Sequence, residues 1–466
     1  SEMDQTYIRS NSVYASASLG WRDQLYLDGS VRNDWSSTIR DDFFYPSISL
    51  SWLPIISFSN LRGPVLTYWK LRGSWAEVGA GTTAYRNRAY YYAQPQSFKG
   101  VAQMYRSMIY PNSGLRPENI KTWEVGTELG FFNDRLHTDI TYYHKITTDQ
   151  ILDVTTSNVV GFSSMVLNAG KLENKGIEIQ LYGDILRKEN GLTWRSTVNF
   201  AKDQSKIIEL YPQLDLKDYR IGWTWGIANM ARAGEKWGTL VGNSYDRVEE
   251  GPMQGAIKIK SNGLIQTKAS QDLGNVTPDF LLSWRNDFTI KDFSFGFLLD
   301  MRKGGDIWSQ TMSHSYVAGT AEITAENGIR ERAITAGVDV MPEERFAMQT
   351  EDGSWVQNTI STNAQSWYES GGVDQMYVFD GSFIKLREAS ITYNLPQRYL
   401  QRVKGIKQVN VSLIGSNLAL LWVDKSNTLR LDPETGGVSS DSRGVGFEQA
   451  SVPTSRSFGL KLGVTF

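Results

Sequence analysis

The stretch SFGLKLGVTF, Ser457 to Phe466, decides the fold of this chain. Its residues of one parity are all apolar, namely Phe458, Leu460, Leu462, Val464 and Phe466. A β-strand places alternate side chains on opposite faces, so this segment has one apolar face and one small or polar face. A long apolar edge strand invites aggregation in water, whereas the outward face of a membrane barrel meets lipid. The stretch therefore favours a membrane-spanning strand.

The same alternation recurs along the chain, in residues 25–31, 69–75, 123–131, 136–146, 177–181, 192–200 and 293–301. The pattern predicts about 13 or 14 strands of about ten residues, the length that a tilted transmembrane strand requires. A soluble β-sandwich or propeller also alternates, so parity alone leaves that reading open. The apolar faces carry Trp, Phe and Leu in nearly every segment and the opposite faces carry charges. We therefore expect an all-β, transmembrane antiparallel barrel.

Short polar turns and long connections follow one another between these segments. Asn133-Asp134 and Lys291-Asp292 predict tight hairpins, whereas long connections are expected near 79–119, 204–279, 303–380 and 424–454. Structureless connections of that length are rare in soluble domains but common on the outer side of membrane barrels. We therefore predict short periplasmic turns and long extracellular loops.

Two local irregularities are also predicted. Residues 321–333 suit short helical turns that Asn327-Gly328 would interrupt. In the strand 383–394, Ile384 and Leu386 share one parity and Ala389, Ile391 and Tyr393 the other, which predicts a β-bulge near Glu388.

Composition supports this class and argues against others. The 466 residues include 42 Gly, 15 Trp, 22 Tyr and 19 Phe with only 40% hydrophobic residues, which suits strands, turns and aromatic girdles. Cysteine is absent, which excludes disulfides and thiolate metal sites. The net charge of −2 and the lack of a basic stripe argue against nucleic acid as a partner.

Several motifs together resemble the SusC/RagA family of TonB-dependent outer-membrane transporters of Bacteroidetes. They include YWKLRGSWAEVGAG (Tyr68 to Gly81), SGLRPENIKTWEVGTELGFFNDRLHTDITYYHKITTDQIL (Ser113 to Leu152), NAGKLENKGIEIQL (Asn168 to Leu181) and FIKLREASITYNLP (Phe383 to Pro396). SNLALLW (Ser416 to Trp422), LDPETGG (Leu431 to Gly437) and the closing RSFGLKLGVTF are similar to the C-terminal region of the family.

The resemblance implies the C-terminal part of a plugged 22-stranded barrel that imports large nutrients, usually glycans and sometimes peptides. It also implies a SusD-like surface lipoprotein, the TonB complex and outer-membrane lipid as partners, together with an N-terminal plug and barrel portion that this chain does not match. A peptide importer, a self-contained passive porin of about 14 strands and a surface adhesin stay open as alternatives.

The sequence predicts no catalytic site, cofactor or metal site. Glu124 and Glu128 share a strand parity, but solvated charges facing the lumen explain them better than a glycosidase pair. The three histidines are too scattered for a metal site, and acidic residues 424, 432 and 434 suit a solvated loop turn better than bound calcium.

Aromatic residues in the long connections are the better binding candidates, because sugar rings stack on Trp and Tyr. The predicted substrate-binding residues are Tyr90, Tyr91, Tyr92, Trp223, Trp225, Trp308, Trp355 and Trp367. Loop packing or membership of the interfacial girdle is an alternative role for each of them. Polar residues of the opposite strand face are expected to line the lumen or contact a plug, namely Lys70, Arg72, Glu124, Glu128, Arg195, Lys385 and Arg387.

Overall fold

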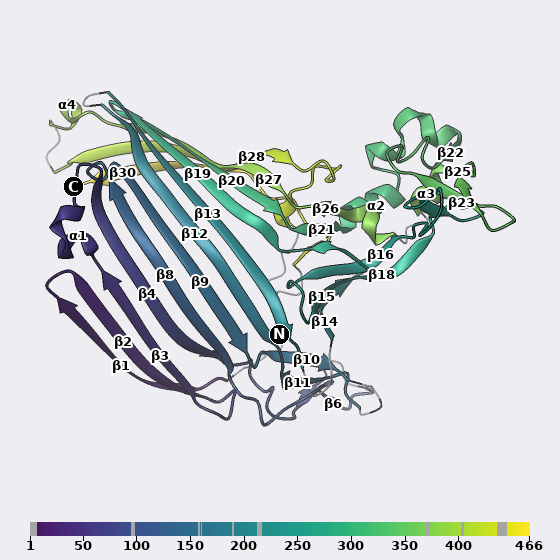
Figure 1. Cartoon of the computed structure of the whole chain (residues 1–466), viewed down its shortest axis with the longest axis horizontal. Coiled ribbons are helices and arrows are strands. Elements are labelled where there is room, and N and C mark those ends of the chain that lie inside the picture. The colour runs from purple at the N-terminus through teal and green to yellow at the C-terminus, as the bar shows by residue number, and fades with distance from the viewer. Residues whose placement is uncertain are drawn as a thin grey trace. The chain divides into compact units, whose positions relative to one another are not determined.

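The computed structural model describes residues 7–94, 98–156, 159, 161–188, 191–211, 217–369, 373–401, 405–435 and 445–466. Thirteen long strands form one antiparallel sheet in the order β1-β2-β3-β4-β8-β9-β12-β13-β19-β20-β27-β28-β30 (Figure 1). The predicted all-β architecture is confirmed, and the strand number lies within the predicted range. The chain divides into two compact units, which we describe separately.

Unit 1 covers residues 1–219, 232–236 and 284–291. Its long strands are β1 (Ser10–Trp21), β2 (Leu25–Ser36), β3 (Phe43–Trp52), β4 (Leu66–Ala80), β8 (Glu118–Phe131), β9 (Leu136–Thr148), β12 (Lys171–Arg187) and β13 (Leu192–Glu209). The connections contain β5 (Tyr91–Ala93), β6 (Met104–Arg106), β7 (Ile109–Tyr110), β10 (Ile151–Thr155), β11 (Ser164–Asn168), α1 (Pro54–Ser57) and η1 (Ser59–Leu61).

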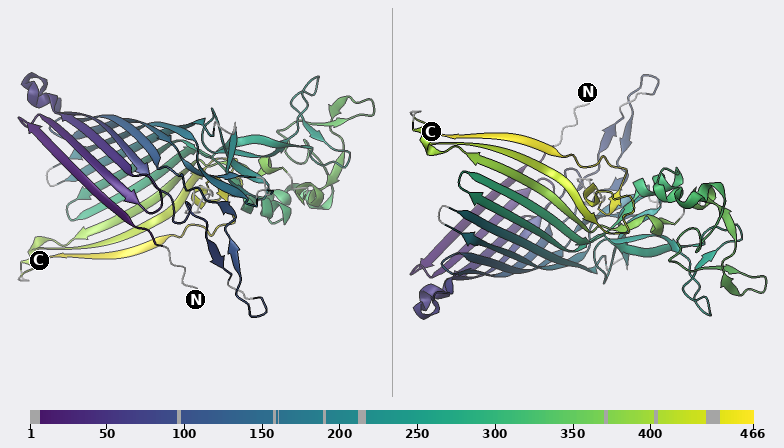
Figure 2. Two further views of the ribbon diagram at one scale, coloured as in Figure 1. Left: turned by 90° about the horizontal axis from the view of Figure 1, so that it is seen from below. Right: turned by 90° about the horizontal axis from the view of Figure 1, so that it is seen from above.

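Unit 2 covers residues 220–231, 237–283 and 292–466. Its long strands are β20 (Phe293–Gly304), β27 (Phe383–Asn394), β28 (Gln408–Val423) and β30 (Ser457–Thr465), and β19 (Pro278–Ile290) has residues in both units. Figure 2 shows these strands in two further views.

The connections around unit 2 hold many short elements. The strands are β14 (Asp218–Thr224), β15 (Ile227–Arg232), β16 (Thr239–Tyr245), β17 (Ile257–Ile259), β18 (Thr267–Asn275), β21 (Asp306–Ser309), β22 (Ala333–Thr335), β23 (Phe346–Gln349), β24 (Trp355–Gln357), β25 (Ser361–Asn363), β26 (Val378–Asp380) and β29 (Phe447–Glu448). The helices are α2 (Gln310–Val317), α3 (Ala364–Glu369), α4 (Gln397–Leu400), η4 (Glu322–Thr324), η5 (Glu326–Glu331), η6 (Asp374–Tyr377) and η7 (Pro433–Thr435).

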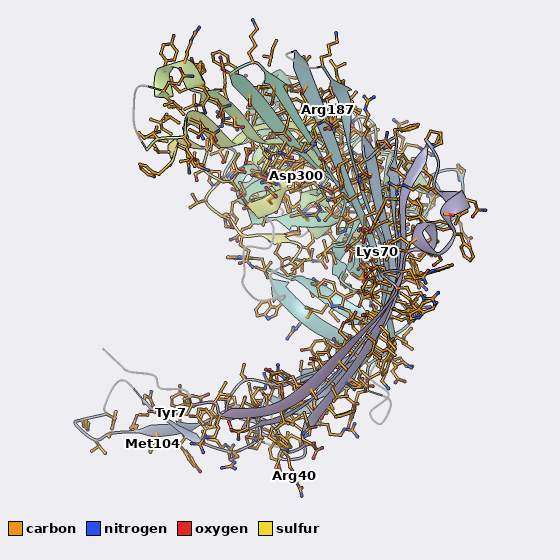
Figure 3. All side chains as sticks on the ribbon, turned by 90° about the vertical axis from the view of Figure 1, so that its left-hand side faces the viewer. Tyr7, Arg40, Lys70, Met104, Arg187 and Asp300 are labelled. Carbon is orange, nitrogen blue, oxygen red and sulfur yellow. The ribbon has the colours of Figure 1, made fainter. Side chains whose placement is uncertain are left out.

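Register places the two kinds of side chain on opposite faces of the sheet. Val125 of β8 pairs with Tyr142 of β9, which pairs with Ile177 of β12, so one face carries apolar rows. The neighbouring positions Glu128 and Asp139 pair with each other on the other face. Figure 3 shows side chains leaving both faces of the strands. In water the exposed apolar rows would be costly, whereas lipid tails would cover them.

The predicted turns and irregularities are present. Asn133 and Asp134 join β8 to β9 with positive φ angles of 54° and 62°. Register shifts in both pairings of β27 leave Arg387 outside the ladder, which places the bulge one residue before Glu388. Residues 322–331 form 3₁₀ turns broken by the positive φ angles of Asn327 and Gly328.

The long connections of unit 2 are folded, contrary to the expectation of structureless loops. Their side chains form a hydrophobic core that includes Ile227, Leu240, Ile307, Met312 and Phe379, all almost fully buried. Because this core is built from three separate connections, no single segment shows it in the sequence. Among the helices that the structure describes, none is long and apolar enough to span a bilayer.

Candidate functional site

A charge network lies on the polar face of unit 1, where the sequence predicts lumen-facing residues. Lys70 Nζ donates to Glu128 at 3.0 Å, and Arg72 Nη1 donates to the same carboxylate at 2.8 Å. Arg72 Nη2 also reaches Asp139 at 2.6 Å, so one guanidinium bridges β4 to β9 across β8. Gly126 permits this, because a Cβ there would lie 2.7 Å from Arg72 Nε.

A second network in unit 2 joins the strand β27 to the β28–β30 connection. Lys385 is only 4% exposed, and its Nζ donates to Asp432 Oδ2 at 2.6 Å and to Glu434. Arg387 donates to Glu434 Oε1 at 2.6 Å and to Asp300 of β20. The bulge aims Arg387 at these carboxylates, because a bulged residue leaves the ladder and turns its side chain.

The acidic turn of this connection is held in its ionised form. Burial alone would raise the pKa of Glu434, but hydrogen bonds from Arg387 and Lys385 outweigh it and lower the pKa to about 2. Asp432 also accepts from Thr454, and the backbone N–H of Glu434 donates to Asp432 Oδ1 at 3.1 Å. These contacts fasten the turn of residues 432–434 to the polar face of β27. Residues 436–444 of the same connection lie outside the described residues.

The remaining two predicted lumen residues lie on the same strand faces but outside these networks. Arg195 Nε donates to Asp184 Oδ1 at 2.8 Å between β13 and β12. Glu124 is exposed and lies opposite Tyr143 of β9 in the register. Asp139, Asp300 and Asp432 were not predicted as partners of these residues, although strand parity places Asp139 and Asp300 on the same faces.

Two of the three predicted tyrosines of the first long connection, Tyr90 and Tyr92, form a cluster with Tyr105. Tyr90 and Tyr92 have touching hydroxyl groups, and Tyr92 stacks on Tyr105 with ring centroids 5.1 Å apart. Tyr91 is 65% exposed. Tyr90 and Tyr92 also line a cavity of about 150 Å³ with Arg86.

The predicted tryptophans divide into exposed and buried ones. Trp223 and Trp225 are 64% and 68% exposed, and the ring of Trp225 meets the edge of His314. Trp308 and Trp367 are 2% and 3% exposed, within the core of unit 2. Trp355 is half-buried, with Lys258 Nζ 5.4 Å from the centre of its ring.

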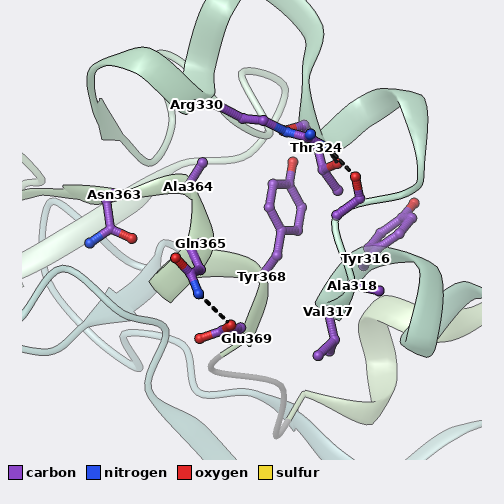
Figure 4. A pocket seen from close by; sticks show the side chains of 11 residues that line it. Tyr316, Val317, Ala318, Thr324, Arg330, Asn363, Ala364, Gln365, Tyr368 and Glu369 are labelled. Atoms are coloured by element: carbon purple, nitrogen blue, oxygen red, sulfur yellow. Dashed lines mark hydrogen bonds between the residues drawn. The ribbon is translucent and has the colours of Figure 1, made fainter.

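A larger pocket, of about 490 Å³, opens between α2 and α3 (Figure 4). Tyr368 contributes an aromatic ring, and Arg330, Asn363, Gln365 and Glu369 contribute polar groups. Gln365 donates to Glu369 at 2.7 Å, which orients the carboxylate at the pocket wall. Burial raises the pKa of Tyr368 to about 12, so this phenol is neutral at physiological pH. None of these residues was predicted from the sequence to bind a ligand.

The side chains of the pocket and of the charge networks could bind a ligand through hydrogen bonds and ring contacts. Among the described residues, no group of three or more His, Asp or Glu is placed to hold a metal ion. A ring with hydrogen-bonding groups around it suits a hydroxyl-rich ligand or a peptide segment.

Comparisons with known proteins place the chain in a family. Residues 2–297 match the model of the family described as "TonB dependent receptor-like, beta-barrel". TonB-dependent receptor P26 of Formosa agariphila is 27% identical over 98% of this chain and 46% of its own length. TonB-dependent receptor SusC of Bacteroides thetaiotaomicron is 25% identical over 42% of this chain and 17% of its own length. The chain thus spans less than half the length of these relatives.

A solved structure shows the same fold. The structure described as that of the RagAB peptide transporter superposes with a TM-score of 0.73 over 98% of this chain and 47% of that chain, at 18% identity. The alternating strands, the opposed faces and the family match agree. The chain belongs to the TonB-dependent receptor-like β-barrel family of outer-membrane proteins.

Proposed function

We propose that this chain forms the C-terminal wall of an outer-membrane importer that takes up an oligomeric nutrient with energy from the TonB complex. The observation that carries the proposal is that the sheet has one apolar face and one polar face on which side chains form ion pairs. Such a polar wall suits a hydrated lumen or a plug that hydrogen-bonds to it. A SusD-like surface lipoprotein would cover the extracellular connections. No catalytic role is proposed for any residue.

The strand count supports a larger barrel over the self-contained porin. The sheet has 13 described strands, and in a sheet of antiparallel pairs the first and last of 13 strands run in the same direction. Antiparallel closure needs an even number of strands. Further strands that pair antiparallel with β1 at one edge and with β30 at the other would complete the wall. The rest of a 22-stranded barrel would provide these strands.

For the cargo we propose a glycan, with a peptide as the alternative. Exposed Trp223 and Trp225, and the pocket around Tyr368, offer ring faces to sugar C–H groups. Arg330, Asn363 and Glu369 would bind hydroxyls. The relative described as a peptide transporter has the same fold, and fold alone does not determine the cargo.

The test uses the full-length transporter purified in detergent and titrated calorimetrically with a panel of oligosaccharides and oligopeptides. We expect an oligosaccharide to bind, and the double variant Trp223→Ala/Trp225→Ala to weaken that binding at least tenfold. The control Trp21→Ala removes an exposed ring beside a short turn and should leave the affinity unchanged. Binding of peptides alone would overturn the glycan assignment, and undiminished uptake by the full-length transporter in cells that lack TonB would overturn active import.

A further inference from the structure

Four exposed lysines lie on the apolar face of unit 1, where lipid-facing side chains are expected. They are Lys121 of β8, Lys175 of β12, and Lys202 and Lys206 of β13; we call them the lysine patch. The register fixes their face, because Lys202 pairs with Ile177 and Ile177 pairs with Tyr142. In the next row, Lys175 pairs with His144, which pairs with Trp123.

The lysine patch lies toward the outer ends of the strands. The long connections 81–117, 149–170 and 210–277 leave from this end, whereas the opposite end carries the short turns. Lys121 and Phe131 are separated by about ten residues of β8, which is about 33 Å along the strand and about 25 Å in height at a tilt near 40°. That height equals the apolar band of a membrane barrel, which places Lys121 at its outer boundary. Lys202 lies the same ten residues from Leu192, at the short-turn end of β13.

The surroundings of the patch leave a positive surplus. Lys121 Nζ lies 3.7 Å from Glu77, and Lys175 Nζ lies 3.5 Å from Glu173, which also bonds His144. Lys202 and Lys206 form no ion pair within the described part of the chain. Four lysines thus face two carboxylates.

Aromatic rings beside the patch mark the same level of the membrane. Trp75 and Trp123 pair across β4 and β8 and are 38% and 41% exposed. Trp side chains gather where lipid tails meet headgroups, so their height agrees with that of the lysines.

We propose that the lysine patch binds the phosphate groups of an anionic lipid in the outer leaflet. Ammonium groups at a membrane surface attract anionic headgroups, and lysines on adjacent strands can contact more than one phosphate of the same lipid. A neutral headgroup would leave the surplus charge of Lys202 and Lys206 uncompensated. The proposal depends on the outer-membrane location of the family and not on the transport activity proposed above.

Native mass spectrometry of the full-length protein in detergent tests the proposal, with bisphosphorylated lipid A as the probe. We expect bound lipid on the parent protein and little binding of the same lipid after enzymatic removal of its phosphates. Lys175→Gln/Lys202→Gln/Lys206→Gln should weaken binding by about a hundredfold, from about fivefold per lysine. Lys236→Gln/Lys260→Gln/Lys268→Gln removes the same charge from exposed positions elsewhere and should leave the binding unchanged.

Two results would overturn the proposal. Equal binding of lipid A by the patch variant and the parent, with both proteins showing the heat-modifiable migration of a folded barrel, would remove the lysines from the site. Full competition by millimolar inorganic pyrophosphate would show that the patch recognises free phosphate and not a lipid.

Discussion

Replacing Lys385 by methionine should release the acidic turn of residues 432–434 from β27. The ammonium group is buried and contacts both Asp432 and Glu434, so the variant leaves two carboxylates near each other with Arg387 as their nearby cation. Removing one partner of a buried ion pair costs about 3–5 kcal/mol. The lower end applies here, because the Glu434 side chain is 32% exposed and keeps its bond to Arg387.

Hydrogen–deuterium exchange of the full-length protein measures this effect. A loss of about 3 kcal/mol in the local opening free energy raises amide exchange in residues 424–435 on the order of a hundredfold. The matched control is Lys303→Met, which breaks the more exposed pair with Asp380 at 3.4 Å. That pair contributes about 0–1 kcal/mol, so exchange near it should rise by less than about fivefold. Similar small changes in both variants would refute the structural role given to Lys385.

Three further predictions follow from the same structure. The pKa of Glu434 in the folded protein, about 2, lies below its ordinary value of 4.5. The stabilisation that the ionised carboxylate gives is therefore fully present above pH 4.5 and is lost as the pH falls toward 2. Amide exchange of residues 424–435, corrected for intrinsic rates, should be equal at pH 7 and pH 5 and should rise below pH 4.5. Arg72→Met should lower the free energy of unfolding in urea by about 1–3 kcal/mol, because it removes the cation that joins Glu128 and Asp139. The control Arg32→Met breaks an exposed ion pair and should cost less than about 1 kcal/mol. Equal losses in the two variants would contradict the network. Trp367→Ala should lower the free energy of unfolding by about 3–5 kcal/mol and make the connections sensitive to protease, because Trp367 is buried. The control Trp223→Ala removes an exposed ring and should change the free energy of unfolding by less than about 0.5 kcal/mol. Protease resistance of Trp367→Ala would contradict its position in the core.

The period-2 pattern is sufficient to predict the membrane strands, because lipid-facing positions within the apolar band are apolar at nearly every second residue of a strand. The bulge of β27 could also be predicted from the sequence, because one extra residue places Ile384 and Ile391 at positions of different parity. These features are local, and so the sequence expresses them within a single segment.

The folded core of the connections and the pocket were not predictable in the same way. Trp308 and Trp367 lie 59 residues apart in the connection 303–380 and are buried together with residues of the connections 204–279 and 424–454, such as Leu240 and Phe447. An aromatic residue in a loop therefore looks the same in the sequence whether it packs in a core or faces solvent. The Lys385 contacts were missed for a related reason, because Asp432 reaches β27 only once the β28–β30 connection folds back.

Spin labelling in a lipid bilayer tests most directly whether lipid covers one face of the strands. The chain has no cysteine, so single cysteines can be placed in β8 at Val125 and Leu129 on one face and at Glu124 and Glu128 on the other. Labels at Val125 and Leu129 should collide with oxygen dissolved in the bilayer, and labels at Glu124 and Glu128 with a water-soluble nickel chelate. Equal access of both reagents to the two pairs of sites would contradict a membrane-spanning sheet.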